Sequence, residues 1–359
     1  MAKHDDDRLS VAHPGPSGLH AKLIVIRRTD NTGLVTVLGI ESTAHTFGVG
    51  IVNSQGKILA NVMKIYKPSV GGIHPREASQ HHAAKAAEAV AEAFQTAGIK
   101  PSDIDAVAFS QGPGMGPCLR TGATVARTLS LALRKPLIGV NHGVAHIEIG
   151  KLVTNCGDPV VLYVAGGNTM VVALVEKKYR ILGETLDIAA GNCLDAFGIS
   201  AGIGPMPAAE IYAKQGSKIY DIPYRVNGMD VSFSGLLTAS EKLLKSGVPL
   251  GDVCLSLTET VYSMLTEVTE RALAMTAKSS LLLVGGLARS KRLCEMLNTM
   301  CVDRGASLHV VPDQYAGDNG AMIAWTGLLM YGCKQFINVD ESFVKPRMRV
   351  DEVEVCWSP

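Results

Sequence analysis

The pattern of apolar and polar positions along the chain predicts an α/β fold that opens with strands. Three apolar, β-rich runs are separated by polar turns, as expected of neighbouring strands: Leu34–Ile40, Phe47–Val52 and Lys57–Ile65. The Ala- and Glu-rich stretch His82–Ala97 predicts a helix that ends before Gly98. Ile104–Ser110 is again apolar and predicts a buried strand.

A glycine-rich loop and a helix follow that strand. The glycines of Gln111–Pro117 disfavour a helix there, whereas Leu119–Leu133 has helical character. The apolar run Pro136–Val140 then predicts a short buried strand, which leads into the segment VNHGVAHIEIG.

The second half of the chain repeats this order. Val160–Val164 and Met170–Val175 predict strands joined by a glycine turn, and a turn over Lys177–Arg180 leads to another strand at Ile181 and Leu182. The helix-rich stretch Leu255–Ala277, a strand over Leu281–Val284, and Gly285-Gly286 leading into a helix with Arg289, Lys291 and Arg292 continue the unit. Because the pattern mirrors Val37–Leu59, the sequence predicts two related β-β-β-α units with a cleft between them.

Composition narrows the range of partners and compartments. The 34 Lys and Arg residues nearly balance the 33 Asp and Glu residues, so charge alone does not predict strong nucleic-acid binding. The eight cysteines form no C-x-x-C pair and are expected to be reduced, mostly buried thiols. No apolar run is long enough to span a bilayer. Residues 1–33 are polar, lack a secretory apolar region, and are expected to be largely disordered in a cytoplasmic protein.

His142 and His146 are the first candidates for chemistry. Their i,i+4 spacing on a helix places both imidazoles on one face, within reach of a single metal ion. The alternative is a helix cap at His142 and a half-buried side chain at His146. The preceding strand favours the metal site, because α/β folds place their chemistry at the ends of strands.

Asp318 offers a third ligand, although it equally fits an N-cap for the helix that runs to about Met330. Two nitrogens and one oxygen leave positions open for substrate, as catalytic metal sites require. The glycine turn over Ala165–Thr169 exposes backbone N–H groups that suit phosphate oxygens, but a hairpin needs glycine for its own geometry too.

A second histidine cluster comprises Gly71–Glu77 together with His81 and His82. A surface loop leading into a helix is favoured over a second metal site, and a lid over the cleft or a nucleic-acid contact is the functional alternative.

The chain carries several long motifs: VNHGVAHIEIG, YVAGGNT, GMDVSFSGLLT, LLVGGLARSKRL, GDNGAMIAWTG and DEVEVCW. Together they resemble the family of TsaD and the catalytic subunit of KEOPS, once described as glycoproteases. The resemblance covers about Val35 to Trp357. NCLD, DVSFSGLLT and the DEVEV tail are similar to the archaeal and eukaryotic KEOPS type.

The resemblance implies an α/β fold of the actin-like ATPase (ASKHA) class, with two RNase H-like domains around a central cleft. We expect one domain over residues 34–155, with 328–359 returning to it, and the other over 156–327. The implied reaction is transfer of the threonylcarbamoyl group from threonylcarbamoyl-AMP to N6 of the adenosine 3′ to the anticodon of ANN-decoding tRNAs. ATP or threonylcarbamoyl-AMP is then the nucleotide ligand.

The resemblance also implies roles for individual residues. His142, His146 and Asp318 match ligands of one divalent metal, iron or zinc, and Tyr163 matches a position that contacts both metal and substrate. The substrate-binding positions are Tyr163, Val164, Ala165, Gly166, Gly167 and Asn168 in the phosphate-facing loop, with Asp195 and Glu210 at the nucleoside. Met206 stands where the family usually has a substrate-facing glycine, and Ser290 where it often has asparagine. The Gly198–Pro207 segment is shorter than the family pattern, and Ala196 replaces a frequent basic residue.

The implied partners are tRNA and KEOPS-like subunits, namely a kinase-like ATPase, a small dimerising subunit and a tRNA-binding subunit. No membrane is expected, and the compartment is the cytoplasm, with the nucleus added if the source is eukaryotic. Two other functions fit parts of the sequence: a small-molecule kinase or ATPase on the same fold, and a metallopeptidase. The latter would need H-E-x-x-H, whereas Gly143-Val144 follow His142 here.

Overall fold

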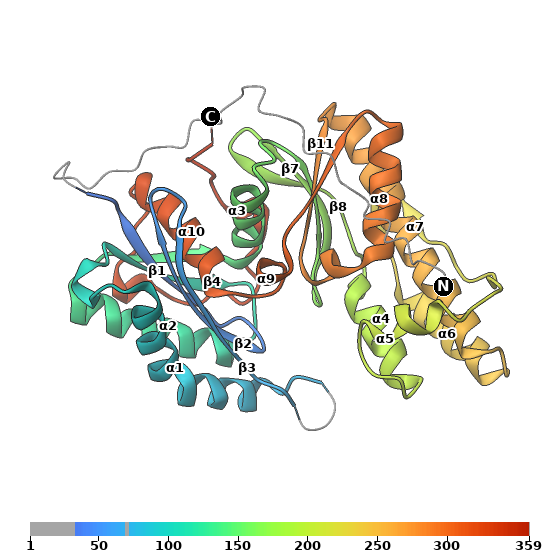
Figure 1. Cartoon of the computed structure of the whole chain (residues 1–359), viewed down its shortest axis with the longest axis horizontal. Coiled ribbons are helices and arrows are strands. Elements are labelled where there is room, and N and C mark those ends of the chain that lie inside the picture. Colours follow the sequence, from blue (N-terminus) through green and yellow to red (C-terminus); the bar gives the residue numbers. More distant parts are fainter. Residues whose placement is uncertain (1–32, 69–71, 359) are drawn as a thin grey trace, which may run out of the picture.

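The computed structural model describes residues 33–68 and 72–358. The predicted disordered extension lies outside the described residues except for Gly33, and so does Gly71 of the second histidine cluster. Two five-stranded mixed sheets form the frame of the described chain. Figure 1 shows them side by side, the first in blue and teal and the second in green and orange.

The first sheet has the strand order β3-β2-β1-β4-β5. Its strands are β1 (Thr36–Glu41), β2 (Thr46–Asn53), β3 (Ile58–Ile65), β4 (Ala106–Gly112) and β5 (Leu137–Asn141). β1 pairs antiparallel with β2, and β2 with β3, whereas β1 with β4 and β4 with β5 are parallel. The parallel strands are buried along their whole length, as their continuous apolar runs require.

The second sheet has the order β12-β11-β6-β7-β8 and repeats this pairing. Its strands are β6 (Val160–Val164), β7 (Thr169–Val175), β8 (Lys178–Glu184), β11 (Ser280–Val284) and β12 (Ser307–Val310). β6-β7 and β7-β8 are antiparallel, and β6-β11 and β11-β12 are parallel. The prediction of two related units is therefore confirmed. The domain boundaries at 155/156 and 327/328 stay a prediction.

Two helices lie between the sheets (Figure 1). The inner pair is α3 (His142–Thr154) and α10 (Gly320–Gly332). On the first unit α1 (Pro75–Ala97) and α2 (Gly116–Leu133) pack together against the sheet. The second unit carries α4 (Ala190–Ser200), α5 (Ala208–Ala213), α6 (Ser234–Lys245), α7 (Leu250–Thr276) and α8 (Lys291–Asp303). A two-stranded ribbon, β9 (Val226–Asn227) and β10 (Asp230–Val231), precedes α6.

The inner helix α10 approaches the first sheet unusually closely. A Cβ atom added to Gly320 would lie 2.2 Å from the backbone nitrogen of Gly50 on β2. Gly39 on β1 meets the helix in the same way, at 2.1 Å from the backbone nitrogen of Ala324. Glycine is required at these positions because no side chain fits between the two backbones.

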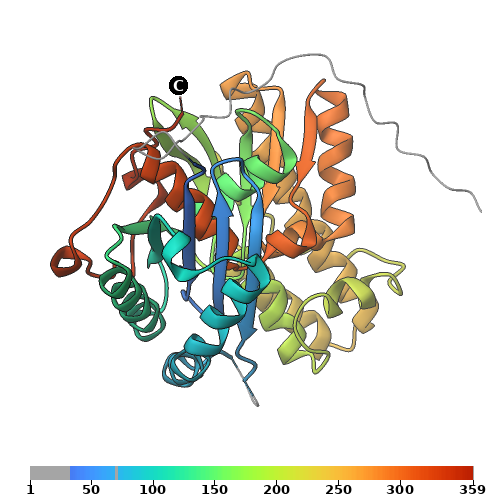
Figure 2. The same cartoon turned by 60° about the vertical axis from the view of Figure 1, so that its left-hand side comes forward.

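The tail after α10 runs back along the first unit, as the red trace on one side of Figure 2 shows. Its short helical turns are η3 (Val339–Glu341) and η4 (Val350–Glu352). Arg127 donates to the hydroxyl of Ser342, and the Asn141 amide donates to the carbonyl of Arg349. The tail thereby holds the start of α3 in place.

Several element boundaries differ from the prediction. α1 begins at Pro75 rather than at His82, since proline suits a first helical turn and that turn is exposed. β8 is longer than expected because the turn before it is confined to Glu176 and Lys177, both with positive φ. Arg289 is not on the same helix as Lys291 and Arg292: it ends the 3-10 turn η2 (Gly286–Arg289), and α8 begins at Lys291.

The expectation that all eight cysteines are thiols was wrong for two of them. Cys333, at the end of α10, forms a disulfide with Cys356 in the tail. The other six are free, and five of these are buried. Sequence spacing did not reveal the pair because the two cysteines are 23 positions apart and the chain between them folds back along the first unit. Among the described residues, no helix combines the length and apolar character needed to cross a lipid bilayer.

Candidate metal and nucleotide site

The two histidines lie in the first two turns of α3. Asn141, the last residue of β5, caps this helix by accepting a hydrogen bond from the backbone N–H of Val144, so the alternative of a cap at His142 is excluded. The ring centroids of His142 and His146 are 4.7 Å apart, and both side chains are buried. The predicted one-face arrangement is confirmed.

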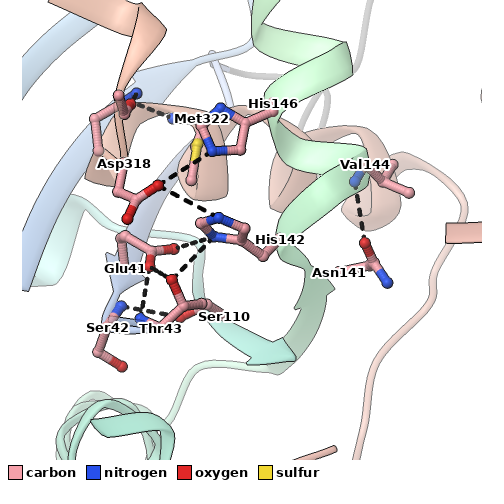
Figure 3. A network of polar contacts seen from close by, with 12 residues as sticks. Glu41, Ser42, Thr43, Ser110, Asn141, His142, Val144, His146, Asp318 and Met322 are labelled. Carbon is pink, nitrogen blue, oxygen red and sulfur yellow. Dashed lines mark hydrogen bonds and ion pairs between the residues drawn. The ribbon is translucent and has the colours of Figure 1, made fainter. Parts of the chain in front are cut away.

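Asp318 reaches the histidines from the other end of the chain. It lies between α9 (Asp313–Ala316) and α10, and its Oδ1 is 3.4 Å from Nε2 of His142 and 3.3 Å from Nε2 of His146. Figure 3 shows the carboxylate facing both rings. The cap of α10 is Asn319, which accepts from the backbone N–H of Met322, so Asp318 is not the N-cap.

These three side chains form a metal-binding geometry. Each offers one ligand atom, and the three atoms lie within 4.8 Å of one another. It is the one such group found in the ranges 33–68 and 72–358. The cluster joins β5 and α3 of the first unit to the segment that follows β12 of the second.

Two residues that the sequence interpretation treated only as a polar turn support the cluster. Glu41, at the end of β1, places Oε2 3.0 Å from Nδ1 of His142. Its Oε1 accepts hydrogen bonds from the backbone N–H and the hydroxyl of Thr43, at 2.6 Å and 2.5 Å (Figure 3). A carboxylate behind a histidine orients the ring and strengthens it as a metal ligand. The sequence signal that could have identified Glu41 was a charged residue directly after an apolar strand, and the structure shows that this residue is buried.

The electrostatics of the cluster reflect these short contacts. Burial lowers the pKa of His142, but the carboxylates of Glu41 and Asp318 outweigh it and raise that pKa to about 10. Burial likewise lowers the pKa of His146, and Asp318 only partly offsets this. Burial alone would raise the pKa of Asp318, yet the two imidazoles hold it well below its usual range.

Tyr163, at the end of β6, completes the wall beside the histidines. Its ring centroid is 5.3 Å from that of His146, and its hydroxyl is buried without a hydrogen-bond partner among the described residues. Burial, followed by the charges of Asp318 and Glu41, raises the pKa of this hydroxyl. Two nitrogens, a carboxylate and an unpartnered buried oxygen fit the donor set of zinc or iron.

The cluster opens into a cavity of about 830 Å³ between the two units. Twelve of the thirteen predicted site residues line it: His142, His146, Tyr163, Ala165, Gly166, Gly167, Asn168, Asp195, Met206, Glu210, Ser290 and Asp318. The exception is Val164, whose side chain is buried within β6. Lining residues that the sequence interpretation had not singled out include Thr43, His45, Asn192 and Pro207.

The glycine turn lies close to the backbone of two neighbouring segments. A Cβ on Gly285, where φ is 94°, would lie 2.4 Å from the carbonyl oxygen of Val164, so only glycine fits there. A Cβ on Gly191 would lie 3.3 Å from Cα of Gly166. The turn after β6, the start of α4 and η2 therefore meet at one wall of the cavity.

The far side of the cavity carries polar groups that are already bonded. Asp195 accepts from the backbone N–H of Met206 at 2.7 Å, and burial raises the pKa of its carboxyl. Glu210 accepts a hydrogen bond from the hydroxyl of Tyr262. Ser290 caps α8 through the backbone N–H of Leu293, at 3.1 Å. These contacts hold Asp195, Glu210 and Ser290 at the lining.

The second histidine cluster is built differently. His82 is fully buried, and its Nε2 lies 3.0 Å from the carbonyl oxygen of Ala44. Burial lowers its pKa to about 4. His82 thus belongs to the packing between α1 and the β1-β2 connection, in keeping with a structural interpretation.

Comparison with known proteins identifies close relatives. The sequence model described as "TsaD: tRNA N6-adenosine threonylcarbamoyltransferase" matches residues 57–325. The chain is 56% identical to the tRNA N6-adenosine threonylcarbamoyltransferase of Thermofilum pendens over 324 residues, which cover 89% of this chain and 96% of that protein. It is 54% identical to a probable bifunctional tRNA threonylcarbamoyladenosine biosynthesis protein of Methanocaldococcus jannaschii, covering 89% of this chain and 60% of that protein.

A solved structure supports the fold. HypF of T. kodakarensis superposes with a TM-score of 0.59 at 15% sequence identity, covering 83% of this chain and 48% of that chain. The paired sheets and this likeness agree with the expected actin-like fold. On the strength of the sequence matches, the chain belongs to the TsaD family of tRNA N6-adenosine threonylcarbamoyltransferases.

Proposed function

We propose that this chain transfers the threonylcarbamoyl group from threonylcarbamoyl-AMP to N6 of the adenosine 3′ to the anticodon in ANN-decoding tRNAs. The observation that carries the proposal is the His142, His146 and Asp318 cluster opening on a nucleotide-sized cavity in a member of this family. Such a cavity, with few polar groups on a mostly formed wall, is typical of ligand sites.

The reaction is an acyl transfer. A bond forms between N6 of adenosine and the carbamoyl carbon, and the bond from that carbon to the phosphate oxygen breaks. The electron pair leaves with AMP, and the N6 proton passes to water. No side chain has to act as a covalent nucleophile, because the anhydride is already activated.

Four residues would hold the metal: His142, His146, Asp318 and Tyr163. The donor set fits zinc and iron alike. When bound, the ion supplies Lewis-acid stabilisation of the charge that develops on oxygen. Glu41 keeps Nδ1 of His142 protonated, which leaves Nε2 of that ring free to face the site.

The remaining predicted residues would bind the nucleotide. Backbone N–H groups of the turn from Ala165 to Asn168 would act as preorganised donors, and the phosphate oxygens would accept their hydrogen bonds. Asp195 and Glu210 would accept from the nucleoside, with Met206 and Ser290 beside it. Val164 contributes its backbone only, since its side chain is buried.

The near-balance of charges suggests that tRNA affinity depends on other subunits. We infer a KEOPS-like assembly with a kinase-like ATPase, a small dimerising subunit and a tRNA-binding subunit, acting in the cytoplasm, or also the nucleus of a eukaryotic source. A kinase or ATPase on the same fold is the second candidate, favoured only by the cavity shape. The metallopeptidase is disfavoured because Gly143-Val144 provide no glutamate base.

The test is reconstitution. The chain and its partner subunits are incubated with threonine, bicarbonate, ATP, the upstream adenylate-forming enzyme and an unmodified ANN-decoding tRNA, and the modified nucleoside is measured by mass spectrometry. We expect Asp318→Asn to reduce the product at least about 100-fold, because it removes a charged group from the site. His309→Asn, on β12 outside the cavity lining, is the matched control. Because the partner ATPase and the adenylate-forming enzyme both consume ATP, hydrolysis is measured separately with the chain alone. ATP hydrolysis by the chain alone, with no modified tRNA from the complete mixture, would favour the kinase-like function.

A further inference from the structure

Arg289 stands out among the residues that line the cavity. It is the one arginine or lysine in that lining within the described chain. It ends the turn η2, three residues after Gly286, and its side chain is exposed to the cavity rather than packed in the core. Nothing in the reaction as described above uses it.

The guanidinium group lies at the metal end of the cavity. Its Nη2 donates to the backbone carbonyl of Asp313 at 2.8 Å. A Cβ placed on Gly317 would lie 3.6 Å from the same Nη2, and Gly317 directly precedes Asp318. Since consecutive Cα atoms are about 3.8 Å apart, the guanidinium lies against the segment that leads to the candidate metal ligand Asp318.

Most of the donors of Arg289 remain available. An arginine carries five N–H groups in a planar fork, and only the contact with Asp313 uses one of them in the described structure. No carboxylate among the described residues forms an ion pair with it. Three carboxylates, Asp195, Glu210 and Asp318, line the same cavity, so an anion entering it meets a single fixed cation besides any metal.

We propose that Arg289 binds the phosphate of the adenylate donor and holds it as AMP departs. This inference rests on the proposed function for the identity of the donor. The planar fork matches two phosphate oxygens, a pairing that lysine cannot reproduce. Because the phosphate gains a negative charge when its bond to the carbamoyl carbon breaks, the contact strengthens during the reaction and should contribute to kcat.

The test compares AMP with adenosine as probes. Binding of each to the zinc-loaded chain is measured by calorimetry for the unaltered protein, Arg289→Ala, Arg289→Lys and the control Lys291→Ala. Lys291 is exposed two positions along the chain and does not line the cavity. We expect Arg289→Ala to weaken AMP binding roughly 10- to 100-fold, as for loss of a charge-assisted hydrogen bond, and to leave adenosine binding unchanged. Arg289→Lys should recover part of the AMP affinity, and Lys291→Ala should alter neither ligand.

Three results would overturn the assignment. The first is an equal loss of affinity for AMP and adenosine in Arg289→Ala, which would mean that Arg289 contacts the nucleoside. The second is unchanged AMP affinity in Arg289→Ala. The third is no measurable AMP binding by the unaltered chain. Thermal unfolding of each variant shows whether it is folded, and the lysine variant supplies the comparison if the alanine variant is not. If tRNA remains unmodified while AMP binding depends selectively on Arg289, the proposed function fails and the phosphate contact stands.

Discussion

Replacing Glu41 by glutamine probes how the metal site is held together. The buried carboxylate contacts His142 through one oxygen and Thr43 through the other. Glutamine has nearly the same shape, so the change removes the charge without opening a cavity. One of its two possible amide orientations directs an N–H toward Nδ1 of His142, and the other loses a bond from Thr43.

The expected effect is on metal affinity before activity. Loss of a group that hydrogen-bonds to a metal-ligating histidine typically weakens metal binding by about 10- to 100-fold. We therefore expect Glu41→Gln to raise the zinc dissociation constant by that factor. The transferase rate should recover when zinc is supplied in excess, because the ligands themselves remain.

Competition with a chromogenic chelator measures the zinc affinity directly. Glu148→Gln is the matched control, because Glu148 is a buried carboxylate on the same helix as the histidines. It accepts a hydrogen bond from Tyr179 at 2.6 Å and is no part of the cluster. An unchanged zinc affinity in Glu41→Gln, or an equal loss in Glu148→Gln, would refute the assigned role of Glu41.

Three further predictions concern stability. His82 has a folded pKa of about 4 against 6.5 ordinarily, so its neutral form contributes stability above pH 6.5 that is lost as pH falls toward 4. Between pH 6.5 and 4 the free energy of unfolding, measured by urea titration, should therefore fall by about 3 kcal/mol less in His82→Gln than in the unaltered chain. Identical pH profiles of the two proteins would contradict this. Gly320→Ala should lower the free energy of unfolding by about 3 kcal/mol or more, because the added Cβ would clash with the backbone of β2. A Cβ on Gly235 of α6 meets nothing within 4 Å, so Gly235→Ala should not destabilise the protein. Equal melting temperatures for the two variants would refute this. A reductant should lower the free energy of unfolding of the unaltered chain by about 3 kcal/mol, because it breaks the Cys333–Cys356 disulfide. It should not affect Cys333→Ser, which lacks that bond. An equal response of the unaltered chain and the variant would exclude the disulfide.

Much of the fold was predictable because the buried strands are continuous apolar runs. β4, β6 and β11 were all found this way, and the repeat followed from their order. The start of α1 was missed, since its first turn is exposed and has no apolar period. The disulfide was missed because pairing depends on where the tail returns, which local patterns do not encode.

The site was predictable where one element carries it. His142 and His146 share a helix, so their spacing alone placed the two rings together. Glu41 was missed because its contact with His142 spans 101 residues and two elements. Asp318 was a candidate from its residue type and its place before a helix, and the resemblance to a family supported it. Only the packing of α10 against the first sheet explains how it reaches the rings.

The separation of the ligands along the chain has a consequence for biosynthesis. Asp318 follows His146 by 172 residues, and the whole second sheet is made between them. A ribosome-bound chain that has exposed only the two histidines offers an ion two ligands and would bind it weakly. Stable loading of the proposed site would then await the synthesis of Asp318, so metal uptake would report that both sheets have formed.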